Sequence, residues 1–187
     1  TKQLLLAPFS MQTQMVRMIN RVADSAKAGQ PARIVLKINS LTDEPLIAAL
    51  LEAGQAGASI DLIVRGACVL PPGVPGLSDN IRVRSIVGRM LEHTRVLYFR
   101  WGESDKDEAL YLSSADWMNR NMTRRIEAAW PVRDTALRQR VIDECLVPYL
   151  MDVRDAWIQH GNGRYERVSQ EGVSAQQALM VRYQTQP

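Results

Sequence analysis

Apolar positions in the first 64 residues switch between strand-like and helical spacing. A short apolar run at 4–6 precedes a stretch at 11–26 in which apolar residues recur every three or four positions. Residues 33–38 and 59–64 are almost continuous apolar runs, as in buried strands, and helically spaced leucines lie between them at 43–51. The order strand, helix, strand predicts a β-α-β unit whose two strands are parallel.

The middle of the chain combines a stiff loop with further strands. Residues 66–80 hold three prolines and three glycines among apolar side chains. This composition predicts an ordered loop that forms a wall near a site, because flexible linkers are polar and rich in glycine and serine. Residues 81–86 alternate apolar and polar positions, as in a half-buried strand, and the runs at 96–99 and 109–112 predict a hairpin.

The last third of the chain predicts one more strand and two helices. An extended segment at 124–130 precedes a helix that begins at Asp134. The apolar stripe of this helix consists of Leu137, Val141, Cys145 and Tyr149. From residue 161 onward the chain is polar, and we expect a helix near 174–183. These elements together indicate an α/β fold.

Length and composition indicate one domain. The chain has 187 residues, of which 46% are apolar, enough for one well-packed core. The formal net charge is only +3, but most of the 23 basic residues are arginines, which favour polyanionic partners. The alternative is that these arginines only solvate the surface. Two cysteines, Cys68 and Cys145, are too few for a disulfide framework and favour a reducing, cytoplasmic setting.

No segment has the pattern of a membrane span or a signal peptide. No run approaches the roughly 20 consecutive apolar residues of a transmembrane helix, and the chain does not open with a basic and then apolar leader. We therefore expect a soluble protein. Because the sequence starts at Thr1 without methionine and enters an apolar run at once, we expect a fragment of a longer chain.

Polar side chains stand at the ends of the two predicted parallel strands. Lys37 and Asn39 end the first strand, and Arg65 directly follows the second. Because the two strands run parallel, joined by a right-handed crossover, their carboxyl ends share one edge of the sheet. Ligands of open α/β sheets bind outside this edge, so the three residues are candidates for one pocket. For Lys37 the alternative is a strand-end side chain that merely reaches solvent.

His93 and Arg95 lie in a short segment just before a predicted strand. Imidazole can exchange a proton near neutral pH, and guanidinium presents donors that suit phosphate oxygens, so this pair points to phosphate chemistry. The alternative is a structural histidine. No glycine-rich loop with a following lysine supports a P-loop enzyme, and no histidine pair has metal-ligand spacing. His160 stands beside a Gly-Asn-Gly turn, where an exposed, idle imidazole is expected.

Motifs along the chain together resemble the carboxy-terminal domain of bacterial polyphosphate kinase. They are Ile63-Val64-Arg65-Gly66 to Leu70, the Pro-Gly-Val-Pro-Gly-Leu-Ser run from Pro72 to Ser78, Ile81-Arg82-Val83, Ser85-Ile86-Val87-Gly88-Arg89, Leu91-Glu92-His93 and Tyr111-Leu112-Ser113-Ser114-Ala115-Asp116-Trp117. The resemblance covers about residues 4–149 and includes 37–41. That family is similar in fold to phospholipase D, which implies an α/β fold with a mixed β-sheet flanked by helices. Residues 1–187 would then be one catalytic domain, with 150–187 as a variable helical tail.

The resemblance also implies an activity and site residues. It implies an ATP:polyphosphate phosphotransferase that reversibly moves the terminal phosphate of ATP onto inorganic polyphosphate, with Mg²⁺. Arg65 and His93 resemble the family's nucleotide- and phosphate-contacting residues, His93 moving a proton or stabilising the transferring phosphate. Glu127 resembles a further active-site acid. Asn39 and Arg95, together with the Lys37 already discussed, are further candidates for contact with phosphate.

The same resemblance implies which partners this chain needs. The family's phosphate-accepting histidine lies on a preceding domain, so we expect this chain to be inactive by itself. Its expected partners are ATP or ADP, polyphosphate and the preceding domains of the same enzyme, which would form a homo-oligomer at full length. We expect no nucleic acid partner and no metal ligand in this chain, with Mg²⁺ held mainly by other parts of the enzyme.

The sequence departs from the phospholipase D pattern in one respect. Arg95 stands where that pattern has a lysine, two residues after the histidine, and Arg100 stands where it has an aspartate, seven residues after. These arginines keep cationic donors but remove the carboxylate, which suits holding a polyanion better than cleaving a diester. Two alternatives stay open: a stand-alone phospholipase D-like phosphodiesterase, and a non-catalytic module that binds polyanions.

Overall fold

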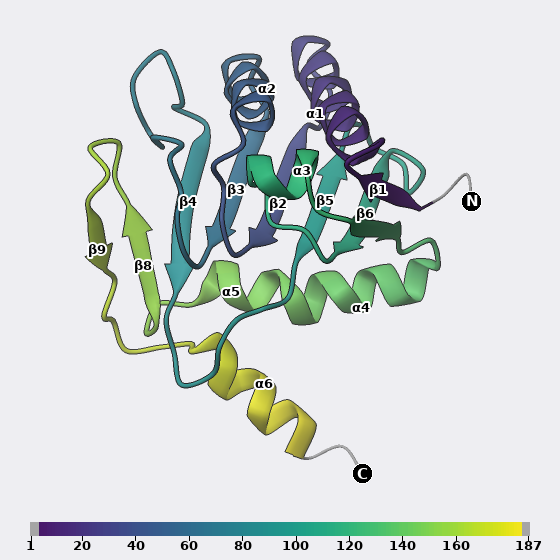
Figure 1. The fold of residues 1–187 in the computed structure, drawn as a ribbon. Helices are drawn as coiled ribbons and strands as arrows, with labels where there is room; N and C mark the ends of the chain where they lie inside the picture. Colours follow the sequence, from purple (N-terminus) through teal and green to yellow (C-terminus); the bar gives the residue numbers. More distant parts are fainter. Residues whose placement is uncertain (1–3, 185–187) are drawn as a thin grey trace.

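The computed structural model describes residues 4–184, which form one mixed β-sheet with helices on both faces (Figure 1). The strands are β1 (Leu5–Ala7), β2 (Arg33–Ile38), β3 (Ser59–Val64), β4 (Ile81–Ile86), β5 (Val96–Arg100), β6 (Glu108–Ser113), β7 (Glu127–Pro131), β8 (Ala156–Gln159) and β9 (Tyr165–Arg167). The helices are α1 (Met11–Lys27), α2 (Glu44–Gln55), α3 (Asn119–Thr123), α4 (Thr135–Cys145), α5 (Val147–Met151) and α6 (Ala175–Gln184). Within this range no helix combines the length and apolarity that crossing a membrane requires. Both ends of the predicted domain, residues 1–3 and 185–187, lie outside the described residues.

The strand order explains why the sheet is mixed. Its strands follow one another as β1-β7-β6-β5-β2-β3-β4-β8-β9. β2, β3 and β4 are parallel, and their neighbours on both sides are antiparallel. This confirms the predicted β-α-β unit, the strand at 81–86 and the hairpin of β5 and β6. The predicted extended segment at 124–130 is a strand only from Glu127 onward.

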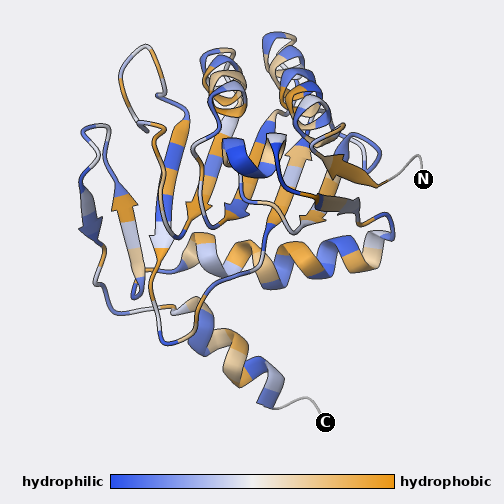
Figure 2. Cartoon of the chain, viewed as in Figure 1, coloured by the Kyte–Doolittle hydropathy of each residue, from blue (hydrophilic) through white to orange (hydrophobic). Residues whose placement is uncertain are grey.

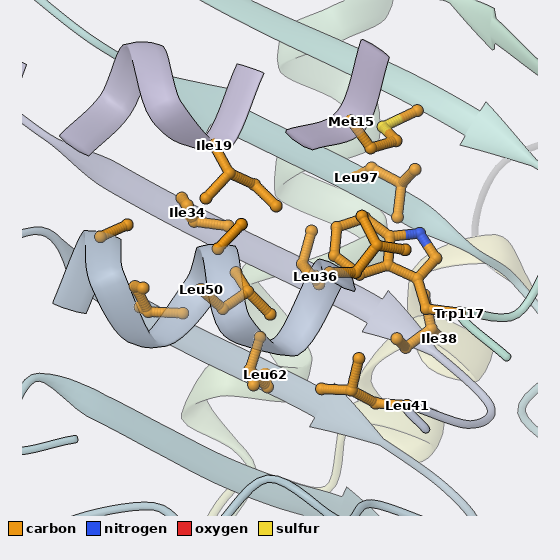
Figure 3. Close-up of a cluster of buried hydrophobic side chains, with 14 of the residues drawn as sticks. Met15, Ile19, Ile34, Leu36, Ile38, Leu41, Leu50, Leu62, Leu97 and Trp117 are labelled. Atoms are coloured by element: carbon orange, nitrogen blue, oxygen red, sulfur yellow. The ribbon is translucent and has the colours of Figure 1, made fainter. Parts of the chain in front are cut away.

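The central strands are buried on both faces, because helices cover both faces of the sheet and the side chains of a strand alternate between them. On one face Leu36 and its neighbours pack under α1 and α2, together with the fully buried Trp117. Figure 3 shows the Trp117 indole among side chains of β2 and β5, with Met15 and Ile19 of α1 above them. On the other face Val35 belongs to a second cluster with residues of α5 and α6.

The loop at 66–80 is ordered, as predicted, but most of it is not a wall of the site. Its turn is held by the Ser78 hydroxyl, which donates to the Pro71 carbonyl at 2.6 Å and accepts from the Val74 amide at 3.0 Å. Because β3 and β4 are parallel, the loop must return from the carboxyl end of β3 to the opposite edge, where β4 begins. Only its first residues, from Gly66, lie at the carboxyl edge.

The helix predicted from Asp134 is divided in two. α4 ends at Cys145, and α5 begins at Val147 with Pro148 in its first turn. Proline lacks an amide hydrogen and its ring clashes with the carbonyl of the residue four positions earlier, so in a helix interior it kinks or, as here, breaks the helix. Leu137, predicted on the buried stripe, is 55% exposed.

The tail after residue 150 is not simply helical. The predicted helix is present as α6, but β8 pairs with β4 and β9 extends the sheet further. β9 is exposed throughout, and Figure 2 shows it as hydrophilic. A short polar edge strand has no alternating apolar pattern from which it could be predicted.

Candidate functional site

Several segments end or begin at the carboxyl edge of the parallel strands. Asn39 follows β2 and Arg65 follows β3. β5 begins there too, since Val96 lies opposite Lys37, and this brings in the segment that carries His93. The prediction that Asn39 and Arg65 share one edge is confirmed.

Arg65 is oriented by Asn39. The Arg65 Nε atom donates to Asn39 Oδ1 at 3.0 Å, and Asn39 is 5% exposed. Neither Nη atom of Arg65 has a hydrogen-bond partner in the described part of the chain. The arrangement fixes the guanidinium through one nitrogen and leaves two nitrogens to donate to an anion.

Gly66 permits the close approach of the two strand ends. Its amide donates to the Asn39 carbonyl at 2.7 Å. A Cβ atom at this position would lie 2.9 Å from that carbonyl oxygen, which belongs to the backbone and cannot easily move. A glycine is therefore required for Arg65 and Asn39 to meet.

Arg95 is held by Asp116, which follows β6. Arg95 Nε and Nη2 donate to the two carboxylate oxygens at 3.0 and 3.1 Å, and Asp116 also accepts from the Asn39 amide at 2.7 Å. Burial alone would raise the pKa of Asp116, but the hydrogen bonds from Arg95 and Asn39 outweigh it and place this pKa below its ordinary value. The carboxylate stays ionised and joins three segments of the edge.

His93 is exposed beside this pair. Arg95 Nη1 donates to the His93 carbonyl at 3.1 Å, and Arg95 Nη2 lies 3.4 Å from His93 Nε2. The imidazole therefore faces solvent at the edge while its backbone is held. Sequence reasoning did not assign Asp116 this part, although the motif around it carried the family resemblance.

Lys37 is buried and paired in this structure, and its contact with phosphate stays a prediction. Its side chain is 3% exposed, its Nζ lies 2.7 Å from Glu92 Oε2, and it stands 3.8 Å from the centre of the Tyr149 ring. Glu92 therefore neutralises its charge in the interior. Through Glu92, Lys37 supports the segment next to His93.

Glu127 lies at the same edge but outside the network around His93. It begins β7, is half-buried, and accepts a hydrogen bond from the Ser114 hydroxyl. No hydrogen bond joins it to His93 or Arg65 in the part of the chain that the structure describes. The structure thus places Glu127 near the candidate site without testing its role.

Arg100 is not at this edge. It ends β5, where its side chain donates to the carbonyls of Gly102 and Glu103 at 3.0 and 2.8 Å. The expectation that both Arg95 and Arg100 supply donors to one site is wrong for Arg100, because a strand of five residues separates the two ends.

The carboxylates at this edge do not assemble a magnesium site. Among residues 4–184 no group of three or more histidine, cysteine, aspartate or glutamate side chains could hold a metal ion. Asp116 is engaged by Arg95 and Glu92 by Lys37, which leaves Glu127. Mg²⁺ prefers several oxygen ligands in octahedral geometry, so these residues alone do not fit it.

Neither the Cys68 thiol nor a hollow elsewhere on the sheet has a part in the site. Burial raises the pKa of Cys68 to about 11, so this thiol is protonated at neutral pH and is not a nucleophile. A hollow of about 880 Å³ opens at the opposite end of β6, lined among others by Lys106, Glu108 and Arg138. It contains none of the predicted site residues.

The fold places the chain in a structural class. It aligns with a phospholipase D family member, Nuc from Salmonella typhimurium, with a TM-score of 0.55 over 84% of this chain and 97% of that one. At 13% identity this likeness concerns the fold alone. The predicted phospholipase D-like architecture, a mixed sheet flanked by helices, is confirmed.

The family follows from closer relatives. The family described as polyphosphate kinase C-terminal domain 2 matches residues 4–178. A polyphosphate kinase from Pseudomonas aeruginosa is 53% identical over 171 residues, which are 91% of this chain and 24% of the relative. The crystal structure of polyphosphate kinase from Porphyromonas gingivalis aligns with a TM-score of 0.90 and 37% identity, over 97% of this chain and 28% of that one. The chain belongs to the polyphosphate kinase C-terminal domain family and spans about a quarter of the length of these relatives.

Proposed function

We propose that this chain supplies nucleotide- and phosphate-binding residues to a polyphosphate kinase, which transfers the terminal phosphate of ATP reversibly onto inorganic polyphosphate. The observation that carries the proposal is that Arg65, oriented by Asn39, lies at the same sheet edge as the exposed His93, with Arg95 fixed by Asp116. Phosphoryl transfer depends mainly on positioning and on neutralising charge, and this arrangement suits both needs.

Each residue has a distinct part in the proposed step. The bond between the terminal phosphorus and the ADP oxygen breaks while a new bond forms to the acceptor. The two unpartnered Nη atoms of Arg65 donate to phosphate oxygens, and His93 moves a proton or stabilises the transferring phosphate. Arg95, paired with Asp116, holds the backbone of His93. Arg95 and Asn39 remain the proposed further contacts with phosphate. Glu127 is the proposed further acid at this edge.

The remaining parts of the proposal come from the family. The acceptor is a histidine on a preceding segment of the longer polypeptide, and the substrates are ATP or ADP and polyphosphate, not nucleic acid. No step depends on a magnesium ion bound by this chain. The full enzyme forms a homo-oligomer in the cytoplasm, a compartment that agrees with two free cysteines in the described residues.

A matched pair of arginine substitutions tests the proposal in the longer polypeptide that contains this chain. Arg65→Ala should lower kcat/KM for ATP by roughly tenfold or more, because it removes charge-assisted hydrogen bonds to phosphate. Arg82→Ala is the control, since Arg82 pairs with Asp61 at the opposite edge, with Nε 2.8 Å from Oδ1. Steady-state kinetics at varied ATP give the answer, and equal kcat/KM in both variants would contradict the proposal.

A further inference from the structure

The segment that carries His93 is tied to the last helix. Residues 87–95 between β4 and β5 form neither helix nor strand, and Figure 1 shows this segment passing the start of α6. Gln176, in the first turn of α6, donates from Nε2 to the Met90 carbonyl and to Glu92 Oε1, both at 2.7 Å. Its Oε1 accepts from the Met90 amide at 2.8 Å. One side-chain amide thus binds the backbone on one side of His93 and the side chain next to it.

Gln176 is itself fixed by its surroundings. It is 7% exposed, so its amide is shielded from water. The Ala175 amide donates to Asp152 Oδ2 at 2.7 Å, and the Ser174 hydroxyl donates to Asp155 Oδ2 at 2.6 Å. These contacts anchor the start of α6 to the turn before β8, so Gln176 is a fixed point of attachment for the segment 87–95.

The contact continues into the interior through Glu92. One Glu92 oxygen accepts from Gln176 and the other lies 2.7 Å from Lys37 Nζ. Lys37 in turn stands over the Tyr149 ring of α5. Glu92, which precedes His93, is therefore bound both by Gln176 of α6 and by Lys37 of the central strand β2.

Gly88 makes room for this contact. A Cβ atom on Gly88 would lie 2.5 Å from Gln176 Oε1 and 2.8 Å from its Cδ. Such a carbon would push the amide away from Met90 and Glu92. The close packing of segment 87–95 against α6 thus depends both on Gly88 in the segment and on Gln176 in the helix.

We infer that Gln176 is a positioning residue for His93: it fixes the segment 87–95 so that the imidazole is presented at the same carboxyl edge as Arg65. Gln176 is buried and does not reach the edge itself, so it acts through Met90 and Glu92. The part of the inference that concerns catalysis rests on the proposed function. The part that concerns the position of His93 does not.

Nuclear magnetic resonance of this chain tests the position. In Gln176→Ala the Met90 amide should exchange its hydrogen roughly tenfold faster, because it loses its acceptor. The imidazole signals of His93 should shift while those of His160 stay. Gln177→Ala is the matched control, because Gln177 is the exposed neighbour whose side chain contacts Arg154 at 3.1 Å. Unchanged Met90 exchange and unchanged His93 signals in Gln176→Ala would overturn the inference.

Kinetics of the longer polypeptide test the consequence. Gln176→Ala should lower kcat by roughly tenfold or more, as expected for a misplaced catalytic group, with KM for ATP within about twofold of the parent value because Arg65 is untouched. Gln177→Ala should change neither. A freed Met90 amide together with an unchanged kcat would overturn the positioning role.

A second variant keeps the test decisive if Gln176→Ala unfolds α6. Gly88→Ala keeps Gln176 unchanged. The added Cβ atom displaces the Gln176 side-chain amide from Met90 and Glu92. It should reproduce the faster Met90 exchange and the loss of kcat. Its failure to do so in a folded protein overturns the inference. If His93→Ala leaves activity intact, the proposed function fails, whereas Met90 exchange still decides whether Gln176 holds the segment.

Discussion

Asp116 joins more of the candidate site than any residue that the sequence singled out. Its two oxygens hold Arg95, and one of them also accepts the backbone amide of Asn39. The side chains of Arg95 and Asp116 are 12% and 14% exposed, so water competes little for these hydrogen bonds. The loss of this carboxylate would release both the cation beside His93 and the end of β2.

The lowered pKa of Asp116 predicts an acid-sensitive contribution to stability. Because the folded-state pKa lies below the ordinary value of 3.8, ionised Asp116 stabilises the fold at pH values above that. The contribution is lost as the pH falls through the folded-state pKa. Asp116→Asn should therefore lower the free energy of unfolding by about 1–3 kcal/mol at pH 7, and the difference from the parent should shrink below about pH 4.

Urea unfolding between pH 7 and pH 3 measures this difference. Asp24→Asn is the control, because Asp24 forms only an exposed pair with Lys27 at 3.8 Å. Its effect should stay below about 0.5 kcal/mol at every pH. A pH-independent loss in Asp116→Asn would contradict the assigned hydrogen bonds.

Some site residues could be predicted from the sequence and others could not. Asn39 and Arg65 follow strands, so the rule for parallel strands was enough to place them together. Lys37 also ends a strand, but its partner Glu92 is 55 residues away, and no local pattern indicates such a contact. The contact of Gln176 with Glu92 joins residues 84 positions apart, and no local sequence pattern predicts it either.

At the scale of elements, Asp43 connects α1 and α2. It is fully buried, caps α2 by accepting from the Leu46 amide at 3.3 Å, and accepts from Gln12 Nε2 of α1 at 2.9 and 3.0 Å. Its own amide donates to the Trp117 carbonyl at 2.9 Å. Asp43 thereby links the helix layer to the segment that carries Asp116.

The N-cap residues of α2 and α4 differ in burial, so we expect their substitutions to lower the free energy of unfolding by different amounts. Asp43→Ala should lower the free energy of unfolding by about 2 kcal/mol, because the cap and the partner of Gln12 are lost together. Asp134→Ala removes the exposed cap of α4, whose Oδ1 accepts from Leu137 at 2.9 Å, and should cost about 1 kcal/mol. Thermal and urea unfolding give both values, and equal costs would contradict the role of Asp43 between the helices.

Strands with a clear pattern of apolar residues were predicted with their correct bounds, whereas short strands without such a pattern were not predicted. β2, β3 and β4 have dense or alternating apolar residues, and their observed bounds are those predicted. β8 has four residues and β9 three, so neither carries enough positions to define a period. The break between α4 and α5 follows from Pro148, a signal that was present in the sequence and was overlooked.

At the scale of the whole molecule, one edge of the sheet gathers segments from the entire chain. β2 and β3 end there, β5 and β7 begin there, and α6 holds the segment before β5. The chain spans about a quarter of the length of its relatives, and the described residues assemble no metal site. The proposal that this edge forms part of a composite site rests on the segments gathered there.

The most direct test of this account uses the two histidines of the chain. ATP-dependent polyphosphate synthesis is measured for the longer polypeptide that contains this chain, for His93→Ala, and for His160→Ala. His160 is an exposed residue near the β8–β9 turn, 3.0 Å from Glu166, and serves as the control. We predict that His93→Ala lowers the rate by roughly 100-fold or more, while His160→Ala keeps the parent rate. A parent-like rate in His93→Ala would contradict the assignment of this edge as a phosphoryl-transfer site.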